Sequence, residues 1–300
     1  MNIISTHNLT KYYGKSRGII DLNLEIPEGE IFGFIGPNGA GKSTTIRTLL
    51  GLIKPTSGSA RIFDKDIVSE KEDILSQIGY MPSEAMFYSG MRVEDIIRFS
   101  ASLHKKDCSP QAENLCDRLQ LDVRKKVDEL SLGNRKKVSI VCALQHNPKL
   151  CILDEPTSGL DPLMQKEFFS ILEEHHREGA TIFLSSHILS EISRYCSRAA
   201  IIREGKLIAL DTVEALSAHT NARRITLSGT THVPQLNGIK DTVPGDNSVS
   251  FLFQGDIKEL LSELSKLPLT DLTVTEPDLE EIFMHFYMAA DSDKSNTNKF

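Results

Sequence analysis

The feature that most constrains the fold is a glycine-rich octapeptide, GPNGAGKS, at residues 36–43. It matches the pattern GxxxxGK[ST], in which glycines let the backbone turn so that its N–H groups point inward at phosphate oxygens. Such a loop needs a buried strand before it and a helix after it, because the positive end of the helix completes the anion site. The apolar run 31–35 and the helical pattern 44–50 meet this need. The octapeptide therefore predicts an α/β sheet with a phosphate loop.

The same octapeptide predicts contacts to a nucleoside triphosphate. The Lys42 ammonium is expected to reach the β- and γ-phosphates, and the Ser43 hydroxyl is expected to ligate Mg²⁺. A glycine-rich loop without a ligand is the alternative, and the flanking strand and helix disfavour it. The other predicted contacts come from the loop backbone and the first helical turn, at Gly36, Pro37, Asn38, Gly39, Ala40, Gly41 and Thr44.

A second apolar strand ends in two carboxylates. Residues 150–153 are followed directly by Asp154 and Glu155. Asp154, at the tip of the strand, is expected to hold Mg²⁺ through water, since this ion prefers oxygen ligands. Glu155 is then placed to polarise an attacking water molecule. Acidic pairs often end strands only because they are solvated there, but the upstream phosphate loop favours the catalytic interpretation.

Strand and helix signals predict the organisation of the 300 residues, a length typical of about two domains. The first 35 residues read as β, residues 92–147 are mostly helical, and strand signals return at 150–153 and 181–184. This alternation predicts a parallel α/β sheet interrupted by a helical block.

A smaller α+β unit is expected after residue 220, with a helix behind an Asp256 cap and a second helical pattern at 279–286. The predicted boundaries are 1–220 with a helical subdomain at about 82–147, then 221–290, then a disordered tail at 291–300.

Composition excludes several classes of protein. Apolar residues at 40% and charged residues at 25% exclude a wholly disordered or fibrous chain. No apolar stretch reaches the roughly 18 to 20 residues of a membrane span, so a membrane part is expected to belong to a partner. The net charge of -7 presents no basic face and gives no support to nucleic-acid binding. The five cysteines form no CxxC pair, so reduced thiols in a cytosolic core are expected.

Further motifs follow in order, and with them residues 1–220 resemble the nucleotide-binding domain of ATP-binding cassette (ABC) transporters. Tyr13, or Tyr12, stands before a glycine where that family stacks adenine. Residues 130–134, LSLGN, take the place of the family's LSGGQ signature, and 158–161, SGLD, resemble its interface loop. The resemblance implies an α/β fold: a RecA-like P-loop NTPase cassette with an inserted helical subdomain, plus a small C-terminal α+β domain, that binds ATP and Mg²⁺.

The resemblance also implies that two cassettes share each ATP. Ser131, Gly133 and Asn134 begin a helix that is expected to offer an anion site, in trans, to the γ-phosphate held by a neighbouring cassette. Asp161 belongs to the loop that crosses this interface and is an expected nucleotide contact. The second cassette is either a copy of this chain or a paralogue.

A histidine after the 181–186 strand completes the implied catalytic set. A lone histidine in such a place is ordinarily structural, but the distance of His187 behind the acidic pair matches the family's switch histidine, which contacts the γ-phosphate. The implied catalytic residues are Glu155, His187 and Lys42.

Two places depart from the family pattern. Where the family has a glutamine that touches Mg²⁺ and the attacking water, this chain has the shorter Ser83. Ser83 is expected to contact the metal through water, with Glu84 as the alternative. Leu132 and Asn134 replace the glycine and glutamine of the signature, which weakens the expectation of a trans phosphate contact. Hydrolysis is nevertheless expected to be competent, whether or not it is slow.

The implied function is ATP hydrolysis for an ABC exporter, in which ATP-driven dimer closure powers export through separately encoded transmembrane permease subunits. The motif EPDLEEIF at 276–283 resembles ABC-2-type exporters of drugs, antimicrobial peptides, lipids or polysaccharides. The implied location is the cytoplasmic face of the cell membrane, as a peripheral subunit. The groove predicted to receive a permease helix, or else to pack as core, contains Met81, Met86, Phe87, Tyr88 and Met91.

Other functions stay open at this point. A soluble ABC ATPase of ribosomes or DNA would be expected to carry two cassettes or a coiled-coil insertion, and the chain shows neither. Ser83 and Leu132 are compatible with a regulatory member that hydrolyses little ATP. A P-loop kinase would lack the 130–134 element. The exported cargo is not identified by the sequence.

Overall fold

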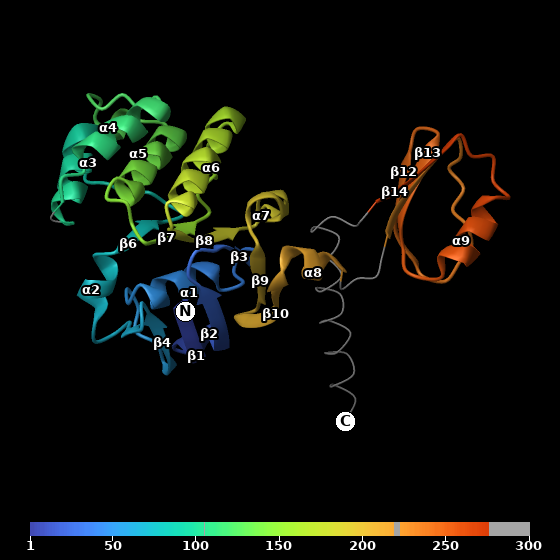
Figure 1. Cartoon of the computed structure of the whole chain (residues 1–300), viewed down its shortest axis with the longest axis horizontal. Coiled ribbons are helices and arrows are strands. Elements are labelled where there is room, and N and C mark those ends of the chain that lie inside the picture. Colours follow the sequence, from blue (N-terminus) through green and yellow to red (C-terminus); the bar gives the residue numbers. More distant parts are fainter. Residues whose placement is uncertain (105, 219–222, 276–300) are drawn as a thin grey trace. The chain divides into compact units, whose positions relative to one another are not determined.

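The computed structural model describes residues 1–104, 106–218 and 223–275. The chain forms two compact units, Met1–Leu210 and Asp211–Phe300 (Figure 1). The division falls within β10 (Lys206–Thr212), the last strand of the larger sheet of the first unit. The boundary predicted from the sequence lies near residue 220.

A six-stranded sheet forms the centre of the first unit. All residues of β3, β7 and β8 are buried, which agrees with the continuous apolar runs of their sequences and with cover on both faces. Neighbouring strands from β9 through β6 are parallel, so their carboxyl ends meet at one edge. The order across the sheet is β10, β9 (Arg198–Arg203), β3 (Ile31–Ile35), β8 (Thr181–Ser186), β7 (Leu150–Asp154) and β6 (Ile78–Met81).

Helix α1 (Lys42–Leu49) follows the phosphate loop directly. It begins two residues before the predicted helical pattern, because Lys42 and Ser43 already form its first turn. Its buried Ile46 belongs to one apolar core together with Phe32 and Phe34 of β3. The loop is thereby held between a buried strand and a packed helix, as its sequence predicts.

An antiparallel sheet packs on the same core. Residues of its first two strands, among them Ile4 and Leu22, join the apolar cluster that contains Ile46. The alternation of apolar and polar residues at 21–26 correctly predicts a half-buried strand here. The order of this sheet is β2 (Ser16–Pro27), β1 (Asn2–Tyr13), β4 (Ser57–Ile62) and β5 (Lys65–Asp66), and α2 (Lys71–Leu75) follows it in the chain.

A helical block lies between β6 and β7 in the chain. Figure 1 shows its helices on the other side of the six-stranded sheet from β1, β2 and β4. This agrees with the helical character predicted for 92–147. The block contains α3 (Val93–Ser102), α4 (Ser109–Arg118), a short 3-10 turn at Val127–Glu129 and α5 (Leu132–Leu144). Two further helices, α6 (Pro162–Arg177) and α7 (Leu189–Tyr195), follow β7 and β8.

The second unit is an α+β domain, with four antiparallel strands and a helix that shares their core. The side chain of Asp256 accepts a hydrogen bond from Lys258 N at 2.8 Å and caps α9, as predicted. The predicted helix at 279–286 and the tail at 291–300 lie outside the described residues. The elements are α8 (Val213–Ala218), β11 (Arg223–Ser228), β12 (Ile239–Gly245), β13 (Ser248–Phe253), α9 (Ile257–Leu264) and β14 (Asp271–Thr275).

Candidate functional site

The phosphate loop joins β3 to α1 and has no room for side chains at two of its glycines. A Cβ atom on Gly36 would lie 2.6 Å from the carbonyl oxygen of Ile202. Gly41 has φ +114°, and a Cβ atom there would lie 2.9 Å from the Gly18 oxygen. The glycine pattern is therefore imposed by close backbone approach as well as by the turn.

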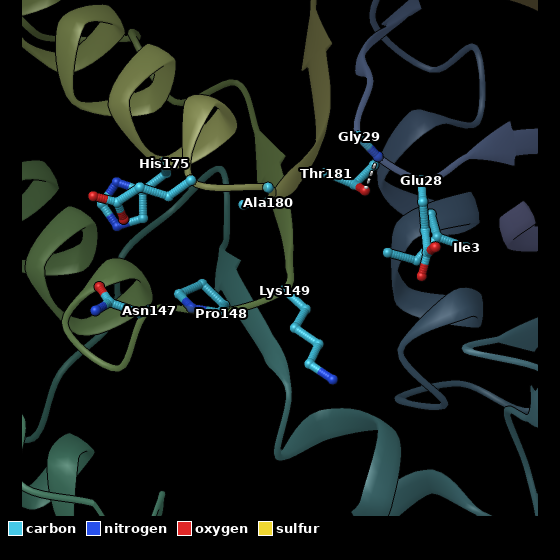
Figure 2. A pocket seen from close by; sticks show the side chains of 11 residues that line it. Ile3, Glu28, Gly29, Asn147, Pro148, Lys149, His175, Ala180 and Thr181 are labelled. Carbon is cyan, nitrogen blue, oxygen red and sulfur yellow. Dashed lines mark hydrogen bonds between the residues drawn. The ribbon is translucent and has the colours of Figure 1, made fainter. Parts of the chain in front are cut away.

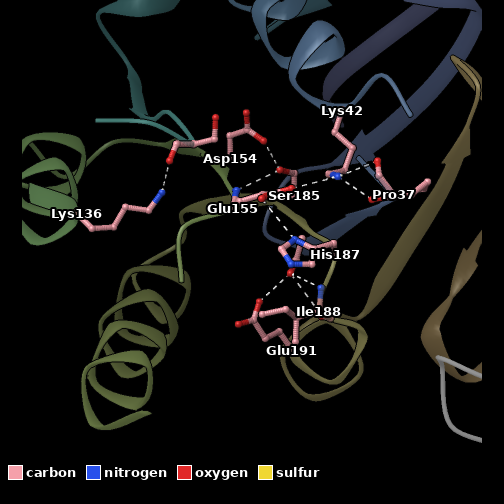
Figure 3. Close-up of polar contacts among 12 residues, drawn as sticks. Pro37, Lys42, Lys136, Asp154, Glu155, Ser185, His187, Ile188 and Glu191 are labelled. Atoms are coloured by element: carbon pink, nitrogen blue, oxygen red, sulfur yellow. Dashed lines mark hydrogen bonds and ion pairs between the residues drawn. The ribbon is translucent and has the colours of Figure 1, made fainter. Parts of the chain in front are cut away.

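Lys42 is held inside this loop, with 5% of its surface exposed. Its Nζ donates hydrogen bonds to the carbonyl oxygens of Gly36 at 2.6 Å and Pro37 at 3.3 Å. Its third partner is the Glu155 carboxylate, with 3.2 Å between Nζ and Oε1 (Figure 3). All three N–H groups of the ammonium are thus occupied, and only the Glu155 contact is one that an anion could replace.

Asp154 lies at the carboxyl end of β7 and is 1% exposed. Its Oδ1 accepts a hydrogen bond of 2.5 Å from the Ser185 hydroxyl on the neighbouring strand β8. The Ser43 hydroxyl, at the start of α1, has no hydrogen-bond partner among the described residues. A carboxylate and a free hydroxyl are oxygen ligands of the kind that Mg²⁺ takes, so the donor chemistry of Ser43 and Asp154 fits this ion.

Glu155 follows in a left-handed backbone conformation, with φ +48°. Non-glycine residues rarely adopt this region, and such strain costs about 1–3 kcal/mol where it is held in place. The backbone N–H of Glu155 donates to the Ser185 carbonyl at 3.0 Å, which helps to hold it. Its Oε2 lies 3.4 Å from Nδ1 of His187, so the carboxylate sits between Lys42 and the histidine (Figure 3).

The His187 loop is anchored by residues that sequence reasoning missed. The Ser186 hydroxyl donates to the Glu191 carboxylate at 2.8 Å and accepts from the backbone N–H of Ile188 at 2.9 Å. Glu191 and Ser186 are buried, whereas His187 is exposed. Serines that end an all-apolar strand were the available signal for this support, because a buried hydroxyl needs a partner.

Lys136 of α5 was also missed. Only 2% of its surface is exposed, and its Nζ donates a 2.6 Å hydrogen bond to the Ser83 carbonyl oxygen. Burial lowers the pKa of Lys136, while the carboxylates of Asp154, Glu155 and Glu84 oppose that shift. The Ser83 main chain therefore faces a buried cation. Metal ligation by Ser83 stays a prediction, and the charge around it does not favour Mg²⁺.

The signature residues lie at the exposed start of α5. The Ser131 side chain accepts a 3.3 Å hydrogen bond from Asn134 N and caps the helix, which leaves the preceding N–H groups of the first turn available to an anion. A Cβ atom on Gly133 would lie 2.7 Å from the Gly159 oxygen, so the signature packs against the 158–161 loop. Leu132 is exposed. The structure thus brings together two motifs that the sequence separates.

Asp161 has a structural task in this chain. Its Oδ1 accepts hydrogen bonds of 3.0 Å from the backbone N–H groups of Leu163 and Met164, and so caps α6 behind Pro162 at the first turn. The predicted contact of Asp161 with nucleotide stays a prediction.

Tyr13 is exposed and lies near the phosphate loop. A Cβ atom on Gly18 would approach the Tyr13 ring to 3.2 Å, and the Gly18 carbonyl is the group that crowds Gly41. The Lys11 ammonium lies 5.5 Å from the ring centroid. A stacking surface for adenine is therefore available at this end of the sheet, and its use stays a prediction.

The predicted apolar groove is only partly a surface. Met81 is fully buried at the end of β6, so for this residue the alternative, packing as core, is the one that the structure shows. Met86 and Tyr88 are 88% and 72% exposed, far more than apolar side chains usually are. These two remain candidates for contact with a partner.

A hollow of about 520 Å³ lies at the other, amino end of the parallel strands (Figure 2). Glu28, Lys149 and His175 line it, and the Thr181 hydroxyl there accepts a 2.8 Å hydrogen bond from Gly29 N. None of the predicted site residues lines this hollow. The candidate site is therefore confined to the carboxyl end of the sheet.

The described part of the chain contains neither a membrane-spanning helix nor a cluster of metal-binding side chains. None of its helices combines the length and apolar character needed to cross a membrane. Its histidine, cysteine, aspartate and glutamate residues form no group of three or more that could hold a metal ion. The five cysteines, all in described segments, are unpaired thiols.

Comparisons with known proteins bear on this geometry. Residues 19–158 match the family described as ABC transporter. The bacitracin transport ATP-binding protein BcrA of Bacillus licheniformis is 43% identical over 210 residues, which cover 69% of this chain and 68% of BcrA. The probable multidrug ABC transporter ATP-binding protein YbhF of Escherichia coli (strain K12) is 34% identical over 223 residues, which cover 73% of this chain but 38% of YbhF.

A solved structure described as the ATP binding subunit of an ABC transporter superposes with a TM-score of 0.69. It is 30% identical in sequence, and the match covers 73% of this chain and 93% of that one. The predicted P-loop α/β fold is confirmed by this likeness.

Proposed function

We propose that two copies of this chain close on ATP and so drive export through a separate membrane subunit. The proposal proceeds from the family: the chain belongs to the ABC transporters as an ATP-binding subunit. Members of this family are ATPases coupled to transport, and ATP is therefore the ligand of this chain. The dimer, the direction of transport and the roles of single residues are the proposed part.

The observation that carries the proposal is the separation of two half-sites within one chain. Lys42 is buried in the phosphate loop, while Ser131 begins α5 at an exposed surface. No hydrogen bond or ion pair between described residues joins 131–134 to 36–43. An exposed helix start that carries a serine and a glycine is suited to an anion from another molecule. A second copy supplies that anion as the γ-phosphate of its own ATP.

Ser43 and Asp154 would hold Mg²⁺, for which their oxygen atoms are suited. When bound, Mg²⁺ supplies charge neutralisation for the β- and γ-phosphates. Lys42 keeps its two main-chain hydrogen bonds and exchanges the Glu155 carboxylate for phosphate oxygen. This exchange frees Glu155 at the moment when nucleotide is present.

The freed Glu155 carboxylate orients a water molecule for in-line attack on the γ-phosphate and accepts its proton. His187, 3.4 Å from Glu155 Oε2, stays exposed and able to reach the γ-phosphate. The strained backbone of Glu155 fixes the direction of its side chain. Catalysis then depends on positioning and on charge stabilisation rather than on a covalent step.

The proposed partner is a membrane permease, and the proposed location is the cytoplasmic face of the membrane. Met86 and Tyr88, which are both exposed, are the apolar side chains proposed to contact the permease. The names of BcrA and YbhF, which refer to bacitracin and multidrug transport, support a drug or antimicrobial peptide as cargo. The motif at 276–283 that resembles ABC-2 exporters lies outside the described residues.

Mixing two inactive variants tests the shared site. Lys42→Ala disables the phosphate loop and Ser131→Arg blocks the exposed helix start, so each protein alone is expected to lose ATPase activity. In a mixed dimer, the Lys42 of one chain and the Ser131 of the other form one intact site, and activity should return. A mixture as inactive as its components would refute the dimer. Wild-type protein with each variant, measured in parallel, shows whether exchange of subunits has occurred.

A regulatory member with little hydrolysis is the second candidate. Ser83 and the exposed Leu132 are the observations that favour it. Steady-state ATPase activity of the complex with its permease distinguishes the two: turnover supports the exporter, and tight ATP binding without turnover supports the regulator.

A further inference from the structure

Lys136 is a buried cation with an incomplete set of partners. Its ammonium has three N–H groups, and the structure gives it one hydrogen bond, to the Ser83 carbonyl oxygen. In the described part of the chain no carboxylate oxygen lies within 4.0 Å of it. Buried charges are normally paired or bound to a metal, because removal from water is costly. A lysine that is 2% exposed with two unused N–H groups therefore needs an explanation.

Two of the three carboxylates that act on the charge of Lys136 are the acidic pair at the end of β7. Asp154 heads the carboxylates that favour the charged form of Lys136, followed by Glu155 and Glu84. Asp154 is itself buried, and its hydrogen bond comes from a neutral hydroxyl, that of Ser185. Figure 3 shows Lys136 reaching from α5 toward the end of β7, where Asp154 lies. Lys136 and Asp154 are thus two buried side chains of opposite charge that form no hydrogen bond or ion pair with each other in the described part of the chain.

We propose that Lys136 is a positioning residue of the metal site: its ammonium acts as a fixed cation beside Asp154, opposes Mg²⁺ there and excludes Ser83 from the metal. The inference rests on the proposed function, because it needs ATP and Mg²⁺ at this end of the sheet. Two positive charges that share one carboxylate in a poorly solvated site repel each other strongly. The ammonium also holds the Ser83 main chain, so that segment keeps its place without a metal ligand.

The consequence is a lower affinity of the cassette for Mg²⁺. Ser43 and Asp154 keep the ligand role, whereas Ser83 loses it to a cation 2.6 Å from its carbonyl oxygen. A longer side chain at residue 83 is then not needed to hold this segment, because Lys136 holds its main chain through the Ser83 carbonyl oxygen. Ser83 and Lys136 are joined by this hydrogen bond, so single substitutions at each position separate the charge of Lys136 from the side chain of Ser83.

A magnesium titration tests the inference without relying on turnover. The purified full chain is titrated with Mg²⁺ at a fixed concentration of a non-hydrolysable ATP analogue, and the heat of binding or the Tm is recorded. Lys136→Gln removes the charge but keeps an N–H donor for Ser83, and it should lower the half-saturating Mg²⁺ concentration about tenfold, or ~1.4 kcal/mol. Lys136→Met is the second charge-removing variant. Lys136→Arg, which keeps the charge, should restore the wild-type value.

Matched controls separate the buried charge from charge in general. Lys125→Met removes an exposed lysine of the same helical block and should shift the half-saturating concentration by less than about twofold, since exposed charges are screened. Ser83→Ala should likewise leave it unchanged, whereas Asp154→Asn should raise it more than about tenfold. Unchanged or weaker Mg²⁺ binding in Lys136→Gln, or weaker binding in Ser83→Ala, would overturn the inference.

The outcome for the wild-type chain distinguishes this inference from the proposed function. If the wild-type protein binds the analogue and Lys136→Gln titrates like Lys125→Met, only the role of Lys136 fails. If the wild-type protein binds no analogue at any Mg²⁺ concentration, the proposed function fails and takes the inference with it.

Discussion

The two ends of the same parallel strands treat buried ionisable groups in opposite ways. At the carboxyl ends, Lys42, Asp154 and Lys136 are each at most 5% exposed, and their partners are fixed dipoles and charges. At the amino ends, burial and the neighbouring His104 lower the pKa of His146 to about 4, so this side chain is neutral at physiological pH. The carboxyl ends thus hold buried lysine and aspartate side chains, whereas the amino ends hold a buried histidine whose pKa is lowered.

The difference lies in the hydrogen-bond partners that each end gives to its buried ionisable groups. His146 Nε2 donates one hydrogen bond of 3.2 Å to the Ile78 carbonyl oxygen, and its Nδ1 has no partner. The ring of His104 stacks on it at 3.5 Å between centroids, which makes a second positive charge still less favourable. At the carboxyl ends, carbonyl oxygens and a hydroxyl are already aimed at the charged groups. These polar partners lie at the end of the sheet where we propose that ATP and Mg²⁺ bind.

The largest expected effect is that of Glu155→Gln at the carboxyl end. Loss of the general base should lower ATP turnover by about 10²–10⁴. ATP binding should be retained or tightened, because the variant no longer competes with phosphate for Lys42. Steady-state turnover and calorimetric ATP binding measure the two effects. Near-normal turnover would remove Glu155 from the mechanism.

The next effect compares a lysine at each end of the strands. Lys42→Ala should weaken ATP binding by about 10²-fold, or ~3 kcal/mol, because a charged hydrogen bond to phosphate is lost. Lys149→Ala removes an exposed lysine from the hollow at the amino end and should leave ATP binding within about twofold. Equal losses in the two variants, measured by calorimetry, would contradict the placement of the nucleotide.

The smallest effect concerns stability at the amino end. The folded chain holds the pKa of His146 near 4, below the usual value of 6.5, so between these pH values the unfolded chain binds more protons. Its contribution is therefore complete above pH 6.5 and is lost as the pH falls toward 4. Going from pH 7 to pH 5 should cost about 2 kcal/mol of unfolding free energy from this group. His146→Gln should flatten that slope in urea unfolding at the two pH values; an unchanged slope would show that His146 titrates normally.

The parts of the site that could be predicted from the sequence are those whose residues are adjacent in the chain. The loop at 36–43 and the pair Asp154 and Glu155 carry their chemistry in fixed local spacing, and the strand and helix around them are set by strong apolar patterns. The structure places Lys42 Nζ and Glu155 Oε1 3.2 Å apart, so the two motifs meet at one end of the sheet. The meeting of these two motifs could be predicted because, in this fold class, parallel strands end at the same edge of the sheet.

The contact between Lys136 and Ser83 could not be predicted in this way. The two residues are 53 positions apart, and in the sequence Lys136 is not distinguished from its basic neighbours Arg135 and Lys137, which are typical of solvated helix positions. Only the packing of α5 against the end of β6 makes one of these three a buried cation. The serines and Glu191 behind His187 were missed for the same reason, since their partners are set by tertiary structure.

Two features of the fold could not be settled from the sequence, for local reasons. The sequence left open whether Met81 belongs to a groove or to the core, and strand β6 carries it into the core. Strand β12 was not predicted, since its sequence IKDTVPG is exposed and contains proline and glycine. It forms as an edge strand paired with β13, and an edge strand tolerates a proline, which has no backbone N–H group.

The central claim is that ATP is enclosed between two cassettes, and the mass of the ATP-bound particle tests it most directly. Light scattering on the Glu155→Gln chain, with and without magnesium-ATP, measures that mass while hydrolysis is blocked. The account predicts the mass of one chain without nucleotide and twice that mass with it. A single chain that retains bound ATP at high protein concentration would contradict the account.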